Sequence, residues 1–251
     1  MSLTGEAGRP PAKVGVPIAD LSAGLFGAYA IMGALLARQR TGRGQQIDIS
    51  MLEAAMALEI WETSGYFADG RVAEPIGSAH RVSAPYQAFR SADGYITIGA
   101  TSPANWKAMC AALGLESLEH DERFAGVASR RERYLELADL IEAITLSQPS
   151  DHWYRLLESA GVPCGVLNRI DQAVNDPHIQ SRGFIVDLPH AKAGSVRATG
   201  SPVRLSETPV RLDHAGPLLG EHTRSIATEL GILGSELDDL LRAGVLGAHQ
   251  P

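Results

Sequence analysis

The strongest constraint on the fold of this chain is an apolar segment near its start, residues 21–37, which directly follows Asp20. Its large side chains occupy more than one side of a helix with 3.6 residues per turn: Leu25, Phe26, Tyr29, Met32, Leu35 and Leu36. We therefore predict a helix over residues 21–40 that is buried on several sides. The run contains serine and several glycines, and we consider it too short and too mixed for a membrane span.

Asp20 stands where this helix begins, and two interpretations of it are open. An aspartate at the start of a helix is often an N-cap, and spacing alone favours that structural role. The same position lies near the positive end of the helix dipole, which suits a nucleophile or a proton acceptor.

Composition predicts a globular chain of one large domain or two moderate ones, with 251 residues, 45% of them hydrophobic and 20% charged. The net charge of −7 and the scattered basic residues give no reason to expect nucleic acid or an anionic membrane as a partner. Cys110 and Cys164 form neither a metal-binding spacing nor a disulfide framework, which fits a reducing cytoplasm. The polar, proline-containing start shows no signal peptide.

The rest of the chain mixes strands and helices, which indicates an α/β or α+β fold. Alternation predicts a strand over 45–50, and an apolar helix over 51–67 follows it before a loop over 68–84. The clearest local signal is a hairpin of 86–90 and 95–99 around Asp93-Gly94, with Tyr86 and Phe89 facing the core. Further elements are predicted as helices 103–114, 129–146, 150–160 and 169–181, a strand 162–167, a strand pair 184–198 around Gly194, and two short helices within 221–243.

Five segments together resemble the class III coenzyme A transferases, the group of formyl-CoA transferase, carnitine CoA-transferase and the bile acid-inducible protein F. They occur in the order that the family has and cover nearly the whole chain. The segments are 18–24 (Ile-Ala-Asp-Leu-Ser-Ala-Gly), 40–51 (Arg-Thr-Gly-Arg-Gly-Gln-Gln-Ile-Asp-Ile-Ser-Met), 84–90 (Ala-Pro-Tyr-Gln-Ala-Phe-Arg), 161–166 (Gly-Val-Pro-Cys-Gly-Val) and 217–223 (Pro-Leu-Leu-Gly-Glu-His-Thr).

The resemblance implies a catalytic role for Asp20, at the position of the family's covalent nucleophile. Its carboxylate would attack the thioester of an acyl-CoA to form a mixed anhydride, and the released CoA thiolate would convert the anhydride to an aspartyl-CoA thioester. An incoming carboxylic acid would then take the coenzyme A by the reverse steps. Acyl-CoA and a carboxylic acid are thus the implied substrates, and no metal is needed.

The family closes its site with a glycine-rich loop, which corresponds here to residues 76–80. This match implies that Gly77 and His80 help to bind the coenzyme A substrate, with backbone N–H groups stabilising the developing charge. The alternative for Gly77 is an ordinary surface turn. The alternative for His80 is a solvated or otherwise satisfied polar side chain.

The implied architecture is a partial Rossmann-like large domain, residues 1–67 with 181–251, and a small α+β domain, residues 75–180. The active site would lie where the two domains meet. Family members form interlocked dimers, so we expect a homodimer whose partner covers apolar surface.

The main departure from the family is that only nineteen residues precede Asp20, whereas family members carry a sizeable N-terminal region there. The chain would be a fragment, one subunit of a split enzyme whose other subunit supplies the N-terminal half, or an inactive protein. The sequence does not choose between these explanations or identify the acyl group.

Two other functions are considered beside the transferase. An α-methylacyl-CoA racemase would use an acid and a base to exchange a proton, but its histidine upstream of the aspartate has no counterpart in residues 1–19. An inactive assembly partner would use Asp20 only as a helix cap.

Overall fold

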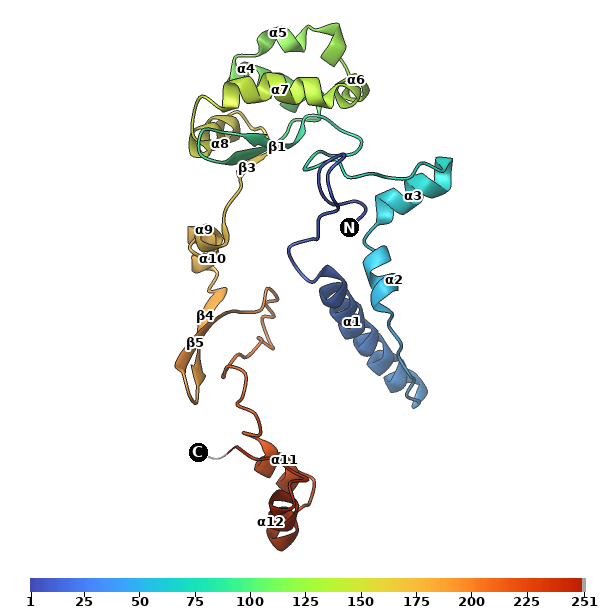
Figure 1. Cartoon of the computed structure of the whole chain (residues 1–251), viewed down its shortest axis with the longest axis vertical. Coiled ribbons are helices and arrows are strands. Elements are labelled where there is room, and N and C mark those ends of the chain that lie inside the picture. Colours follow the sequence, from blue (N-terminus) through green and yellow to red (C-terminus); the bar gives the residue numbers. More distant parts are fainter. Residues whose placement is uncertain (250–251) are drawn as a thin grey trace. The chain divides into compact units, whose positions relative to one another are not determined.

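The computed structural model describes residues 1–249, and the chain divides into two compact units, Met1–Leu167 and the part from Asn168 onward (Figure 1). The first unit contains helices, one 3₁₀ turn (η1) and a small sheet. Its elements are α1 (Ile18–Thr41), α2 (Met51–Met56), α3 (Ile60–Asp69), β1 (Tyr86–Arg90), β2 (Tyr95–Gly99), α4 (Pro103–Leu113), α5 (Glu116–Glu119), η1 (Glu122–Phe124), α6 (Val127–Glu132), α7 (Tyr134–Thr145), α8 (Ser150–Ser159) and β3 (Cys164–Val166).

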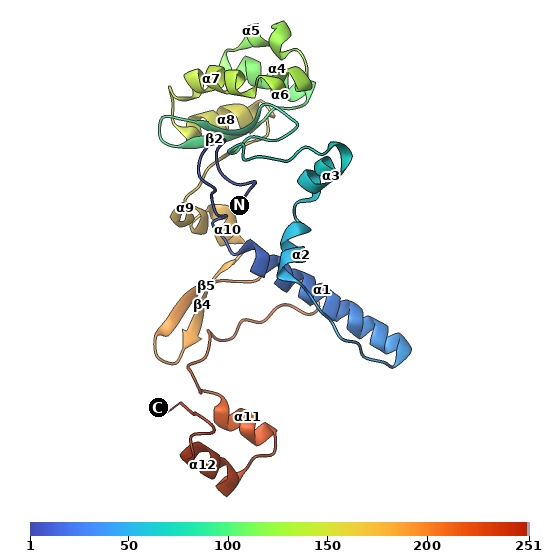
Figure 2. The ribbon, with the colours of Figure 1, turned by 45° about the vertical axis from the view of Figure 1, so that its right-hand side comes forward.

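The core of the first unit is built on the predicted hairpin. β1 pairs antiparallel with β2 in the register Tyr86 to Gly99, and β2 pairs antiparallel with β3, which gives the strand order β1-β2-β3. Helices α4 to α8 gather around this sheet (Figure 2). The buried cluster joins sheet and helix side chains: Phe89, Ile96, Ile98, Trp106, Met109, Leu137, Ile141 and Leu157. This core lies entirely between residues 84 and 162.

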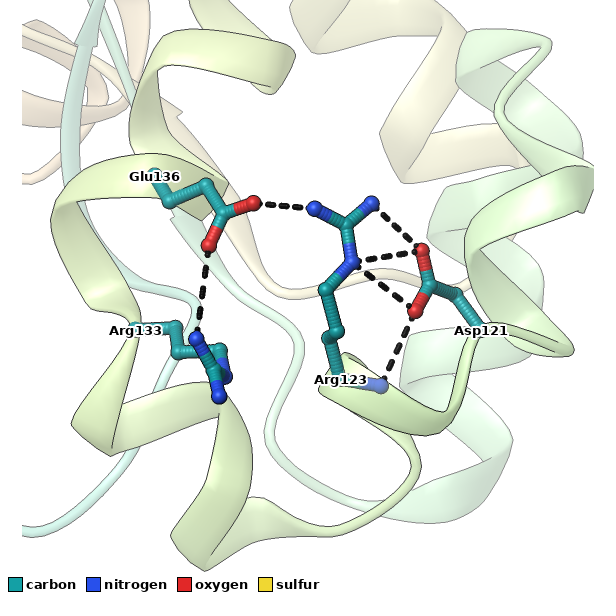
Figure 3. Close-up of polar contacts among 4 residues, drawn as sticks. All are labelled: Asp121, Arg123, Arg133 and Glu136. Carbon is teal, nitrogen blue, oxygen red and sulfur yellow. Dashed lines mark hydrogen bonds and ion pairs between the residues drawn. The ribbon is translucent and has the colours of Figure 1, made fainter.

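A network of ion pairs on the surface beside this core connects η1 with α7. Arg123 donates hydrogen bonds to the carboxylates of Asp121 and Glu136, and Arg133 pairs with the same Glu136 (Figure 3). The four side chains are between 22% and 51% exposed, so each pair contributes little by itself. The network ties η1 to the start of α7.

Helix α1 matches the predicted helix in position but not in burial. Ser22 is its only buried residue, whereas Leu25 is 72% and Met32 58% exposed. α2 packs beside it (Figure 1), and Gly24 and Gly33 have no neighbour near the position of a Cβ. The predicted burial of α1 is therefore wrong within residues 1–249, while the expectation that apolar surface is left uncovered is confirmed.

Three other local predictions need correction. Residues 45–50 form no strand, because none of the described strands pairs with them; Ser50 instead caps α2 by accepting the N–H of Glu53 at 3.2 Å. The helix predicted over 51–67 is two helices, because tight turns over 55–59 end α2. The helix predicted over 129–146 is likewise divided into α6 and α7, at Arg133.

The second unit holds a hairpin and short helices. Its elements are α9 (Ile170–Val174), α10 (Pro177–Ser181), β4 (Ile185–His190), β5 (Gly194–Thr199), α11 (Thr223–Glu229) and α12 (Gly234–Arg242). β4 and β5 pair around Gly194 as predicted. The helix predicted over 169–181 is two helices, because Asp176 accepts the N–H groups of His178 and Ile179 and caps a new helix that starts at Pro177. The prediction of a domain of residues 75–180 beside a discontinuous large domain stays a prediction.

Candidate functional site

Asp20 lies in the first turn of α1, as the third residue of the helix. The N-cap position is Pro17, and Asp20 makes no capping hydrogen bond, so the helix-cap interpretation of Asp20 is wrong. Its side chain is exposed and has no hydrogen bond or ion pair among residues 1–249. The N–H of Leu21 donates to the Pro17 carbonyl at 3.0 Å, but the N–H groups of Ala19 and Asp20 find no acceptor in the described chain. The carboxylate thus has no hydrogen bond or ion pair in the described chain, and its charge lies near the positive end of the helix dipole.

The loop over 76–80 is held to the N-terminal segment through Gly77. Gly77 has φ +65°, a conformation that favours glycine, and its N–H donates to the Gly5 carbonyl at 2.8 Å. That N–H is therefore engaged and is not a free donor in this structure. The hydroxyl of Ser78 accepts the N–H of Ala88 at 3.1 Å, while the N–H of Ser78 itself has no acceptor within residues 1–249.

His80 is a half-buried member of an aromatic group beside the first residue of β1. Its ring stacks on Tyr86 with centroids 4.9 Å apart and an angle of 11°, and it meets Trp61 edge-on at 5.3 Å. The N–H of Val82 donates to Nδ1 at 3.3 Å, which assigns the proton of the neutral ring to Nε2. The interpretation of His80 as a fully solvated loop residue does not fit these contacts.

Two adjoining cavities surround this aromatic group. A cavity of about 430 Å³, here the α1 cavity, is lined by Ile18 at the start of α1 together with Gly77 and His80. A cavity of about 660 Å³, here the α3 cavity, shares Trp61 and His80 with it and extends along α3. The structure thus gathers Gly77, His80 and the first turn of α1 at one place. The Asp20 side chain does not line either cavity, and the residue of its turn that does is Ile18.

Sequence reasoning missed the residues that shape the α3 cavity. Tyr86 was predicted to face the core with Phe89, but it is 52% exposed and supports the His80 ring, whereas Phe89 is buried. Trp61 and Arg131 line the cavity, although Tyr86 itself does not, and Arg81 is fixed there by an ion pair to Glu62 at 2.7 Å. No local motif marks these residues, because their proximity depends on how α3 and the loop fold back.

Clustered metal ligands and thiols with a lowered pKa are both absent from the described part of the chain. Residues 1–249 contain no group of three or more histidine, cysteine or acidic side chains that could hold a metal ion. Burial raises the pKa of the Cys110 thiol to about 12 and also raises the pKa of Cys164. Both thiols are therefore protonated near neutral pH and are poor nucleophiles.

Helix α1 is long and apolar enough, at 24 residues, to cross a membrane by length and composition alone. This corrects the expectation that its apolar run is too short and mixed. The core helix of a soluble protein passes the same test, so one such helix does not by itself indicate a membrane protein.

Comparison with known proteins points to one family. The chain is 32% identical over 230 residues to a succinate–glutarate CoA-transferase of Agrobacterium fabrum, covering 92% of this chain and 58% of the relative. It is 35% identical over 240 residues to a succinyl-CoA–D-citramalate CoA-transferase of Chloroflexus aurantiacus, covering 95% and 59%. The crystal structure of a CAIB/BAIF family protein from Brucella suis is similar with a TM-score of 0.79 at 34% identity, covering 92% of this chain and 60% of that one.

The chain therefore spans about three-fifths of the length of these relatives. The sequence model of CoA-transferase family III matches residues 1–223, which is most of the chain. By this match, by the mixed α/β fold and by the relatives, the chain belongs to CoA-transferase family III.

Proposed function

We propose that this chain carries the nucleophile of a transferase that moves coenzyme A between an acyl-CoA and a carboxylic acid. The observation that carries the proposal is the state of Asp20: an exposed carboxylate in a helix first turn, without structural partner, on a chain of this family. Its turn borders the α1 cavity, where Gly77 and His80 also lie.

The proposed reaction proceeds through two kinds of covalent intermediate on Asp20. A carboxylate oxygen attacks the thioester carbonyl, the carbon–sulfur bond breaks, and a mixed anhydride and CoA thiolate result. The thiolate attacks the aspartyl carbonyl of the anhydride, which releases the first acid and leaves an aspartyl-CoA thioester. The second acid attacks this thioester to form a new anhydride, and the thiolate then attacks its acyl carbonyl. The new acyl-CoA leaves and the Asp20 carboxylate is regenerated.

Each attack places negative charge on a carbonyl oxygen, which needs hydrogen-bond donors. The Nε2–H of His80 is a donor without an acceptor on the wall of the α1 cavity, and we assign the stabilising role to it, with Gly77 fixing the turn. The start of α1 adds the N–H groups of Ala19 and Asp20 and the positive end of the helix dipole.

The proposed substrates are dicarboxylic acids and their coenzyme A thioesters. The relatives named above are succinate–glutarate and succinyl-CoA–D-citramalate CoA-transferases, whose acids each carry two carboxylates. The proposed site is completed in an assembly, because α1 leaves apolar side chains such as Leu25 uncovered. We propose a homodimer in the cytoplasm, with the remaining part of the relatives' length supplied in the same or a second polypeptide. Light scattering of the purified chain tests the dimer, and a monodisperse monomer would contradict it.

The test of the nucleophile is to trap the covalent intermediate. The chain is incubated with succinyl-CoA, treated with hydroxylamine or borohydride, and analysed by intact-mass and peptide mass spectrometry. We expect a hydroxamate or an alcohol on the peptide that contains Asp20. Asp20→Asn should lose the modification, while Asp48→Asn, at another exposed aspartate, should keep it. A folded chain that stays unmodified would show that this chain alone does not hold a competent nucleophile.

A further inference from the structure

Arg131, the fifth residue of α6, is a half-buried cation on the wall of the α3 cavity. Its Nε donates to the Arg81 carbonyl at 2.7 Å, and its guanidinium lies over the Tyr134 ring at 4.2 Å. Within residues 1–249 no carboxylate lies at ion-pair distance from it. The Nε–H bond and the Tyr134 ring together fix the plane of the guanidinium. Its two terminal nitrogens have no acceptor in the described chain.

The other cations of the α3 cavity are already neutralised. Arg81 pairs with Glu62 at 2.7 Å, and Arg71 pairs with Asp69 at 2.6 Å. Glu74 also lines the cavity, but it is exposed, so solvent screens its charge. Arg131 is therefore the one arginine among the described lining residues that lacks an acidic partner. A half-buried guanidinium of this kind has an open place for one anion.

The cavity joins Arg131 to the proposed reaction site. Trp61 and His80 line both the α3 cavity and the α1 cavity, so the two cavities adjoin at these rings. Apolar and aromatic walls of this kind suit the methylene groups of an acyl chain, and a guanidinium matches a terminal carboxylate through two parallel hydrogen bonds.

We propose that Arg131 binds the distal carboxylate of a dicarboxylic substrate and thereby selects dicarboxylic over monocarboxylic acids. The inference rests on the proposed function, because it gives the second carboxylate of that substrate its receptor. A coenzyme A phosphate is the other anion to consider. Because Arg71 and Arg81 are already paired with Asp69 and Glu62, Arg131 offers one unpaired positive charge, which matches a single carboxylate better than a phosphate with two negative charges.

The test compares two acids of equal chain length, glutarate and the monocarboxylic valerate. Binding to the chain is followed by tryptophan fluorescence, since Trp61 lines the cavity. We expect glutarate to bind at least tenfold more tightly than valerate, as a charge-assisted hydrogen bond allows. Arg131→Gln should remove this preference by weakening glutarate alone, and Arg131→Lys should restore part of it. Arg133→Gln, which removes an exposed neighbour that does not line the cavity, should change neither affinity.

Each outcome decides the inference. Equal or absent binding of the two acids, or a preference that survives Arg131→Gln in a variant with a normal circular dichroism spectrum, would overturn it. An equal loss of both acids would show that Arg131 only supports the loop through Arg81. Binding of adenosine 3′,5′-bisphosphate that depends on Arg131 would assign the site to coenzyme A instead.

The experiment distinguishes a failure of the proposed reaction from a failure of the proposed carboxylate site. Acid binding needs no coenzyme A and no nucleophile, so Asp20→Asn should bind glutarate as the unaltered chain does. If Asp20 is not trapped but glutarate selectivity depends on Arg131, the reaction fails and the binding site stands. If Asp20 is trapped equally by succinyl-CoA and butyryl-CoA, with or without Arg131, the reaction stands and the binding site fails.

Discussion

Replacing Arg130 by methionine should strongly destabilise the first unit. Arg130 is only 2% exposed, and it donates hydrogen bonds to three backbone carbonyls, those of Ala84 at 3.0 Å, Phe124 at 2.9 Å and Thr101 at 3.3 Å. Its guanidinium also lies over the Trp106 ring at 4.6 Å. Burial lowers the pKa of Arg130, and no carboxylate of residues 1–249 lies at ion-pair distance. The side chain therefore joins three separate segments through its donors alone.

The magnitude follows from those donors. The two shorter hydrogen bonds are charge-assisted, at about 1.5–3 kcal/mol each, and the bond to Thr101 is longer and weaker. Methionine fills a similar volume but leaves the carbonyls without a donor, while the desolvation of a buried charge is relieved and offsets part of the loss. We expect the free energy of unfolding to fall by about 3 kcal/mol.

Urea unfolding followed by tryptophan fluorescence measures this change. All three tryptophans, Trp61, Trp106 and Trp153, lie in the first unit, so the signal reports on that unit alone. Arg133→Gln is the control, because Arg133 is 51% exposed and its removal should cost less than about 0.5 kcal/mol. A loss below about 1 kcal/mol in Arg130→Met would refute the view that this guanidinium holds the three segments together.

Three further predictions concern Asp93, Cys110 and a fragment of the first unit. The backbone N–H of Ser150 holds the pKa of Asp93 below its ordinary value of 3.8, so its contribution is present above that pH and lost as the pH falls through the folded pKa. Asp93→Asn should flatten the loss of stability as the pH falls from about 5 to well below 3.8 in urea titrations, and an unchanged acid limb would contradict this. Cys110, with its pKa raised to about 12, should react with a thiol reagent only after denaturation; fast labelling of the native chain would show that the site opens. A fragment of residues 76–167 should unfold cooperatively with nearly the midpoint of the whole chain, because it contains the entire buried cluster; a molten fragment would mean that α1 to α3 contribute to the core.

The hairpin was predictable because all of its signals are local. Residues 86–90 and 95–99 alternate, and Asp93-Gly94 supplies the turn, so the register needs no information from distant segments. The alternation of side chains along a strand also explains why the predicted burial of Tyr86 is wrong. Side chains three positions apart on a strand point to opposite faces, so Tyr86 and Phe89 cannot both face the core.

The strand predicted over 45–50 and the buried state of α1 required partners that the sequence does not name. Alternation indicates a half-buried segment, but a strand also needs a neighbour for its N–H and C=O groups, and the described chain provides none at Ile47. Likewise, the apolar residues of α1 show that it needs cover without showing what covers it.

The candidate site was predictable only in part, and for a similar reason. Asp20 was identified by resemblance, because spacing alone favoured the cap that the structure excludes. The contacts of His80 with Trp61 and Tyr86 join segments that are far apart in sequence, and no periodic pattern encodes them.

The pair Arg130 and Arg131 shows most sharply what a sequence leaves open. The two residues are identical and adjacent, but neighbours on an α-helix point about 100° apart. The Arg130 guanidinium is therefore buried and donates hydrogen bonds to three backbone carbonyls. The Arg131 guanidinium faces the α3 cavity, and its two terminal nitrogens have no acceptor within residues 1–249. This difference between the two arginines predicts that their variants change different quantities. Arg130→Met lowers the free energy of unfolding without altering the ratio of glutarate to valerate affinity in the folded fraction, and Arg131→Gln alters that ratio with little effect on unfolding. A single variant that moved both quantities together would show that stability and selectivity are coupled through α6.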